Sequence, residues 1–258
     1  MTFGKKCDKL LQKGRNFAMY VQILLAGLIG GLINLDTYCI AQTMVSRPLV
    51  VSPFLGLILG SLQGSPQEGL YLGAIIGVVL ELVWINTFQV GTIIPPNAAI
   101  SSITTTSLVC IGSITLPLNL LEKVSFLILS MCFGIIVGFF SRWIDFFLFE
   151  KVNITLLHKL EANIKIGNLQ MIEWINWISI GMSFIIHSLI LIGTISVGLF
   201  AVKIITNLLA TKFDLTIILS LLLLFGCGVT ISVLGVRKYF IYFVVGFILT
   251  SIVIFIKG

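Results

Sequence analysis

The sequence predicts an all-α integral membrane protein with about seven transmembrane helices and one re-entrant hairpin. Hydrophobic residues make up 58% of the 258 residues and charged residues only 10%, which is more apolar surface than one soluble core can bury. The apolar residues also gather in runs close to the roughly 20 residues that a helix needs to cross a bilayer. A multi-pass protein surrounded by lipid is therefore expected.

A basic segment, residues 1–16, opens the chain and is expected to be cytoplasmic. Its charged residues are one aspartate, Asp8, and five cations: Lys5, Lys6, Lys9, Lys13 and Arg15. Lys and Arg collect on the cytoplasmic side of membrane helices, so these cations favour a topology signal over nucleic-acid binding. The apolar run 17–35 ends without a small-residue cleavage site, which predicts a retained first helix and not a signal peptide.

The remaining chain, with that first helix, is predicted to form a single membrane domain over residues 17–258. Further helices are expected at 48–63, 99–119, 122–148, 174–201, 214–235 and 239–256. Between the second and third helices, residues 64–98 contain short apolar pieces interrupted by glycines and prolines. Non-helical backbone at membrane depth is tolerated where protein or a cavity surrounds it, so this segment predicts the re-entrant hairpin.

A polar segment at about 149–173 follows four predicted crossings and is therefore expected to be cytoplasmic, like the N-terminus. Its cations Lys151, Lys159 and Lys165 agree with that side. Apolar residues recur within it at helical spacing, which indicates an amphipathic helix at the interface or a docking element for a cytosolic partner. A solvated helix that merely connects two bundles explains the pattern equally well.

Residue types that carry covalent or metal chemistry are sparse in this chain. The five cysteines form no Cys-x-x-Cys pair, and no glycine-rich phosphate loop is present, so no metal, no cofactor and no catalytic residue is expected. His187 lies in an apolar run without an acidic residue, which favours interhelical hydrogen bonding over proton relay. His158 has no acid or base pattern around it that would predict phosphoryl transfer.

The strongest candidate for a binding site is Glu81, which interrupts the apolar run 70–85. An ionisable group at membrane depth is costly and usually faces a cavity, a pathway or a partner. Asn86, Gln89 and Asn97 follow it closely, and such donors and acceptors around a carboxylate suit a polyhydroxyl ligand. The alternative is that Glu81 is a satisfied packing carboxylate and that the prolines only kink a helix.

An ordered set of short motifs runs through residues 36–105. These motifs are Ser46-Arg47-Pro48-Leu49-Val50, Phe54-Leu55-Gly56-Leu57-Ile58-Leu59-Gly60, Gly77-Val78-Val79-Leu80-Glu81-Leu82, Val90-Gly91 and Pro95-Pro96-Asn97-Ala98-Ala99. In their order and spacing they resemble the IIC component of the mannose/fructose/sorbose family of the phosphoenolpyruvate-dependent sugar phosphotransferase system. The rest of the chain resembles that family only in length, hydropathy and a polar break near the middle.

This resemblance implies a membrane sugar permease subunit, multi-pass in the bacterial inner (cytoplasmic) membrane. It implies a hetero-oligomer with a IID membrane subunit and with cytosolic IIA and IIB components, which carry the phosphorylated histidines. The chain itself would then be a non-catalytic translocation subunit for a hexose-like sugar. The family's hairpin glutamate corresponds to Glu81, its usual aspartate after the proline to Asn97, and its acidic residue after the first helix to Asp36.

Two departures from the family pattern concern residues that would affect which sugar is held. Asn97 replaces a carboxylate by an amide, and the chain is longer than usual between Gly60 and Glu81. Two other functions stay open, an ion-coupled secondary transporter that uses Glu81 and a non-transporting scaffold or receptor subunit. Glycines suited to close helix contacts would meet IID or pack within the subunit: Gly27, Gly30, Gly31, Gly134 and Gly138.

Overall fold

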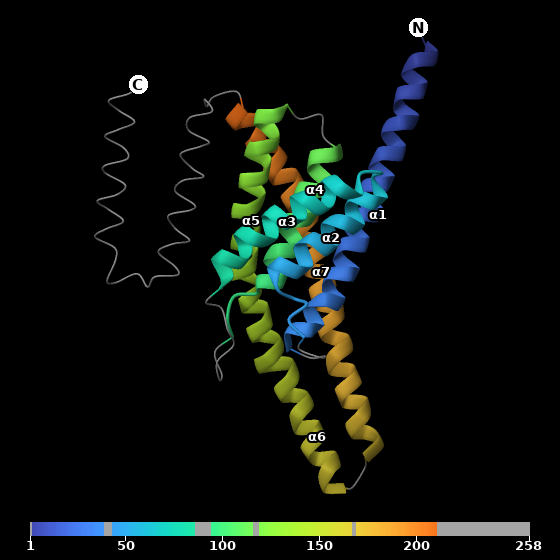
Figure 1. The fold of residues 1–258 in the computed structure, drawn as a ribbon. Coiled ribbons are helices and arrows are strands. Elements are labelled where there is room, and N and C mark those ends of the chain that lie inside the picture. Colours follow the sequence, from blue (N-terminus) through green and yellow to red (C-terminus); the bar gives the residue numbers. More distant parts are fainter. Residues whose placement is uncertain (1, 39–42, 86–93, 116–118, 167–168, 211–258) are drawn as a thin grey trace, which may run out of the picture.

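The computed structural model of the chain is helical throughout its regular structure in the residues it describes, which are 2–38, 43–85, 94–115, 119–166 and 169–210. The elements in chain order are α1 (Thr2–Tyr38), α2 (Pro48–Leu62), α3 (Pro66–Trp84), α4 (Ala98–Thr115), α5 (Leu120–Phe147), the π-helical turn η1 (Leu148–Asn153), α6 (Ile154–Ile166) and α7 (Leu169–Ala210). Figure 1 shows them as one elongated bundle. Five of the predicted helices coincide with α1, α2, α4, α5 and α7, whereas those at 214–235 and 239–256 lie outside the described residues.

Several of these helices are long and apolar enough to cross a membrane. In the described part of the chain such stretches are Phe17–Thr37, Pro66–Trp84, Glu122–Ile166 and Gln170–Thr206. α2 and the first part of α4 are apolar but shorter. The chain is therefore a multi-pass membrane protein, as its composition predicts.

α2 and α3 form an antiparallel helical hairpin whose tip is Gly64, with φ +79°. Residues 86–93 of the predicted re-entrant hairpin lie outside the described residues. Residues 66–84 make one unbroken helix, so the expectation that the apolar pieces of 64–98 are too short or too interrupted to be ordinary spans is wrong for this part. The reason is that the glycines serve packing: a side-chain carbon at Gly56 or Gly69 would collide with the carbonyl oxygen of the other, and one at Gly73 with that of Ser52. Small residues on both helices let the two backbones touch.

α4 lies at the centre of the bundle and contacts α1, α2, α3, α5 and α7. Every residue from Ala99 to Gly112 is buried, and many of them are serines or threonines. Their hydroxyls are partly satisfied within the helix, as in the bonds from Ser102 to the carbonyl of Ala98 (2.6 Å) and from Thr105 to that of Ser101 (2.8 Å). Such small hydroxylated residues allow neighbours to approach from all sides, and Gly134 of α5 meets Thr105 directly.

α1 and α7 pack antiparallel along a glycine-lined contact. A side-chain carbon at Gly27 would meet Ile192, and one at Gly31 would meet Ser188, so the contact partners run in opposite directions along the two helices. These glycines therefore pack within the subunit, one of the two roles expected from the sequence. Because α6 directly precedes α7, it lies at the end of the bundle opposite to the start of α1 (Figure 1).

This arrangement conflicts with the expectation that residues 1–16 and 149–173 both lie in the cytoplasm. The helical hairpin of α2 and α3 returns to the end from which it starts, since Glu81 near its end bonds Leu49 near its beginning. If this hairpin adds no net crossing, three crossings and not four precede residue 149. If α1 spans the bilayer, the two polar segments face opposite sides of it.

We therefore predict opposite labelling of the two ends by a membrane-impermeant thiol reagent on intact cells. One variant would retain Cys7 as its single cysteine, and a second would carry only His158→Cys, a site exposed on α6. Only one of the two should be labelled before permeabilisation, and both after it. Labelling of both or of neither in intact cells would contradict the crossing of α1.

Candidate functional site

The first helix ends in a carboxylate that organises the loop leading to α2. Asp36 accepts hydrogen bonds from the backbone N–H (2.7 Å) and the hydroxyl (2.9 Å) of Thr43. Its second oxygen accepts the N–H of Ser46 at 3.2 Å. Met44, with φ +63°, completes the turn. Asp36 thus fixes the segment 43–46 immediately before α2.

Glu81, near the end of α3, binds the start of α2, next to the segment that Asp36 holds. Its Oε2 accepts the N–H of Leu49 at 3.2 Å, and its Oε1 lies 3.6 Å from the guanidinium of Arg47. The first N–H groups of a helix have no partner within it and attract negative charge. The Glu81 side chain is 24% exposed, so it lies at the start of α2 without being sealed in the core.

Asn97 begins the central helix. Its Oδ1 accepts the N–H of Ile100 (3.1 Å), which caps the first turn of α4. Its backbone N–H donates to the carbonyl of Gly138 on α5 (3.0 Å), and its Nδ2 donates to Oδ2 of Asp145 (3.0 Å). Because a backbone N–H can only donate, the orientation of the amide follows from the Ile100 bond. Asn97 is buried and joins α4 to α5.

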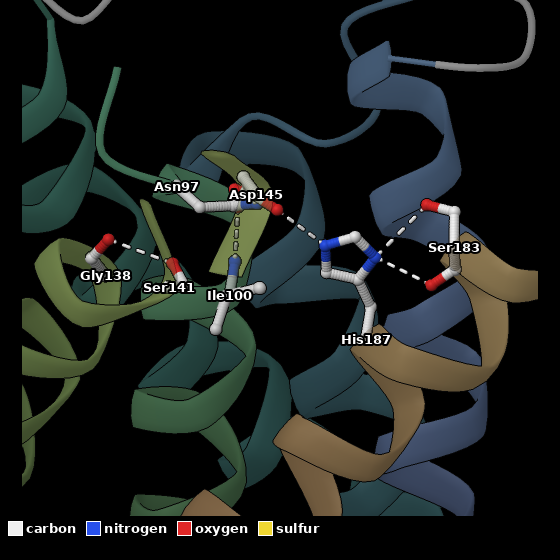
Figure 2. A network of polar contacts seen from close by, with 7 residues as sticks. All are labelled: Asn97, Ile100, Gly138, Ser141, Asp145, Ser183 and His187. Carbon is white, nitrogen blue, oxygen red and sulfur yellow. Dashed lines mark hydrogen bonds and ion pairs between the residues drawn. The ribbon is translucent and has the colours of Figure 1, made fainter. Parts of the chain in front are cut away.

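Asp145 extends this contact to α7, as Figure 2 shows. Its Oδ1 lies 2.7 Å from Nε2 of His187, while Nδ1 of His187 lies 2.7 Å from the carbonyl of Ser183. Both Asp145 and His187 are buried. The sequence interpretation missed this pair because it sought an acid for His187 within α7. The available signal was a carboxylate among the aromatic residues at the end of the predicted helix 122–148.

The predicted ligands therefore fall into two clusters. Asp36 and Glu81 share the segment 43–49, whereas Asn97 belongs to the buried network with Asp145 and His187. Trp84, one turn beyond Glu81, lies between them, because its Nε1 donates to Ser101 of α4 at 3.2 Å. No hydrogen bond among the described residues joins Glu81 directly to Asn97. The candidates Asn86 and Gln89 lie outside the described residues, in the connection between α3 and α4.

Comparison with known proteins gives a family match over most of the chain. The family model of the PTS system sorbose-specific IIC component matches residues 20–256. The fructose permease IIC component of Bacillus subtilis (strain 168) is 24% identical over 237 residues, which span 90% of this chain and 79% of the relative. A putative N-acetylgalactosamine permease IIC component 2 of Escherichia coli (strain K12) is 32% identical over 87 residues, 34% of this chain and 59% of that protein.

Solved structures also resemble the chain in fold. A structure described only as a membrane protein aligns with a TM-score of 0.57 at 17% identity and covers 90% of this chain and 86% of its own. A mannose transporter ManYZ complex with microcin E492 aligns over the same shares at 19% identity, with a TM-score of 0.48. The first likeness supports the helical architecture described above.

The Asn97 contacts predict a specific loss of stability. Asn97→Ala removes a helix cap and leaves the buried Asp145 without one donor, so the free energy of unfolding should fall by about 2–4 kcal/mol. Asn119→Ala is the matched control, because Asn119 caps α5 at an exposed position and should cost only about 0.5–2 kcal/mol. Denaturation of the purified proteins in detergent measures both changes. Equal losses would mean that the bond to Asp145 contributes nothing.

Proposed function

Because the chain belongs to the family of sorbose-specific IIC components of the PTS, we propose that this sugar permease subunit binds a hexose-like sugar and translocates it while a cytosolic IIB component phosphorylates it. The family match over residues 20–256 is the observation that carries the proposal. A bacterial cytoplasmic membrane is the setting that such a system requires. The fructose and N-acetylgalactosamine permeases among the relatives make sugars of this size the first candidates.

We propose that the sugar contacts the region where the α2 and α3 hairpin meets the start of α4. Glu81 supports this placement because it is a partly exposed carboxylate, and an ionised carboxylate accepts strong bonds from sugar hydroxyls. Asn97 opens α4 at the same end of the hairpin, and Asn86 and Gln89 lie in the connection between them. Asp36 would contribute through the segment 43–46 that it holds.

The bonds of Glu81 suggest how binding could lead to movement. In this structure its carboxylate accepts the N–H of Leu49 and forms an ion pair with Arg47 at the start of α2. A sugar hydroxyl that takes over one of these bonds would loosen the start of α2 from the end of α3. Transport by rigid movement of one helical group against another requires such a change in contacts on binding.

The histidines of the chain bear on which subunit carries the phosphoryl group. The sequence has two histidines, His158 on the exposed face of α6 and His187 in the buried network. We assign neither to phosphoryl transfer, because the family implies that IIA and IIB carry the phosphorylated histidines. The chain would position the sugar hydroxyl for a bound IIB at the membrane surface, with a IID subunit completing the membrane complex.

Uptake in cells tests the function. Cells that express this chain together with IID, IIA and IIB should accumulate phosphorylated sugar, while cells that express the chain alone should accumulate none. Radiolabelled fructose, mannose and N-acetylgalactosamine serve as probes. Uptake by the chain alone, driven by an ion gradient without phosphoenolpyruvate, would instead support an ion-coupled transporter.

Glu81→Gln tests the site. The amide retains an acceptor for the N–H of Leu49, and a partly exposed ion pair contributes only about 0–1 kcal/mol, so the protein should remain folded. Sugar binding should weaken by roughly 1.5–3 kcal/mol, or about tenfold to a hundredfold in the dissociation constant. Equilibrium binding to the purified membrane complex measures this change.

Glu68→Gln provides the control on the same helix. Glu68 lies exposed in the first turn of α3, far along that helix from Glu81, and its substitution should leave sugar affinity unchanged. Unchanged affinity in Glu81→Gln would refute the assignment of Glu81 to the sugar site. Failure of the Glu81→Gln subunit to copurify with IID would instead support a purely structural role for that carboxylate.

A further inference from the structure

Asp145 and His187 are the buried pair of charge-bearing side chains in the described bundle. Among the buried residues that the structure describes, they are the only ones of the types Asp, Glu, Lys, Arg or His. Their side chains are 4% and 2% exposed, and Oδ1 of Asp145 lies 2.7 Å from Nε2 of His187. Burial of an ionisable group is costly unless it is paired and hydrogen-bonded. The details of this pairing determine how many protons it holds.

The carbonyl of Ser183 fixes the first proton. It lies 2.7 Å from Nδ1 of His187, and a carbonyl oxygen can only accept, so Nδ1 carries a hydrogen. If Nε2 were the protonated nitrogen of a neutral ring, the lone pair of Nδ1 would face that carbonyl oxygen. The hydroxyl of Ser183, at 3.3 Å from Nδ1, is the more distant partner. The geometry therefore favours the ring with hydrogen on Nδ1.

The 2.7 Å approach of Nε2 to Asp145 then requires a second proton. Either Nε2 carries it and an imidazolium faces a carboxylate, or Asp145 carries it and donates to a neutral ring. Both forms contain the same number of protons, one more than a neutral histidine beside an ionised aspartate. Loss of that proton leaves a buried carboxylate facing the lone pair of Nε2, which is an unfavourable arrangement in apolar surroundings.

The other oxygen of Asp145 connects this proton to Asn97. Oδ2 accepts the Nδ2–H of Asn97 at 3.0 Å, while the Oδ1 of Asn97 caps α4. The proton on the pair holds the Asp145 side chain against α7 and thereby sets where Oδ2 receives the amide. We propose that Asp145 and His187 form a buried binding site for one proton and, through it, act as positioning residues for Asn97. The positioning role rests on the proposed sugar site, whereas the proton site does not.

Other titratable groups on the elements packed around the pair have different surroundings. Asp36 on α1 is held by Thr43 and Ser46, and Cys110 on α4 lies about three and a half turns along the helix from Asn97. The remaining titratable side chains on α5, η1, α6 and α7 are exposed or partly buried: Glu122, Lys123, Cys132, Arg142, Glu150, Lys151, His158, Lys159, Glu161, Lys165, Glu173 and Lys203. Asp145 and His187 are therefore the pair in which a buried proton would be held.

The test compares thermal unfolding of the full chain in detergent between about pH 5 and 8, the range in which histidine changes charge. An unfolded histidine loses its proton near pH 6.5. If the folded pair keeps the proposed proton above that pH, the folded chain binds one proton more than the unfolded chain, and stability should fall as pH rises. The folding equilibrium should change by at most about tenfold per pH unit.

Asp145→Asn is the decisive variant. Its Nδ2–H can donate to Nε2 of a neutral His187, and its Oδ1 can accept from Asn97, so the amide reproduces the bonds without the extra proton. It should fold and lose the pH-dependent part of the stability seen in the wild type. His187→Gln should lose it as well. His158→Gln removes the exposed histidine of α6 and should keep the wild-type profile.

Each outcome bears on the proposal. An Asp145→Asn or His187→Gln chain with the wild-type pH profile would overturn the proton site. Failure of Asp145→Asn to fold would also count against it, because the amide matches the protonated arrangement. The wild-type affinity for the radiolabelled sugars should fall by up to about tenfold per pH unit as the proton is lost. If stability depends on the proton but sugar affinity does not, the positioning role is wrong. If none of the sugars binds at any pH, the proposed function fails. The stability measurement still decides the proton site in that case.

Discussion

The described bundle depends on one buried carboxylate, Asp145, that takes hydrogen-bond partners from two other helices. A charge or a hydroxyl donor inside an apolar bundle is stable only when its partners are in place. Asn97 provides one partner at the start of α4, and His187 provides the other from the middle of α7. The backbone bond from Asn97 to Gly138 brings the start of α4 against α5 in the same place. Three helices are therefore held in one register by a few directional bonds.

The hairpin of α2 and α3 is fixed to this bundle by different means. Its two helices meet through glycines, which gives close contact along their length but little directional preference. Direction comes from its open end, where Asp36 and Glu81 hold the segment before and at the start of α2. Trp84 then connects the end of α3 to Ser101. The proposed sugar region thus lies where the glycine-lined contact between α2 and α3 meets the hydrogen-bonded contacts at the open end of the hairpin.

Much of this fold could be predicted from apolar runs alone, because the membrane imposes the length of each helix. The helix at 66–84 could not, since Gly69, Gly73 and Gly77 read as interruptions although they face the backbone of α2. Asp145 was not predicted as a partner of His187, because an acid was sought only within the apolar run that contains His187. The hydrogen bond between Asp145 and His187 joins two helices, α5 and α7. The residue pattern within either helix alone therefore does not predict it. Glu81 and Asn97 were predicted from their chemistry and Asp36 from the family resemblance alone, but the hydrogen bonds of all three depend on tertiary contacts.

The burial of α4 from Ala99 to Gly112 has a consequence for biogenesis. Its apolar part, Ala98–Gly112, is shorter than a full span and rich in hydroxyls, so by itself it has little tendency to leave the translocon for lipid. In the described part of the chain, its neighbours are α1, α2, α3, α5 and α7, of which α5 and α7 are synthesised later. Stable insertion of α4 therefore awaits the emergence of downstream helices. Mutations in α5 or α7 should therefore first impair the membrane integration of α4, although they leave the sequence of α4 unchanged.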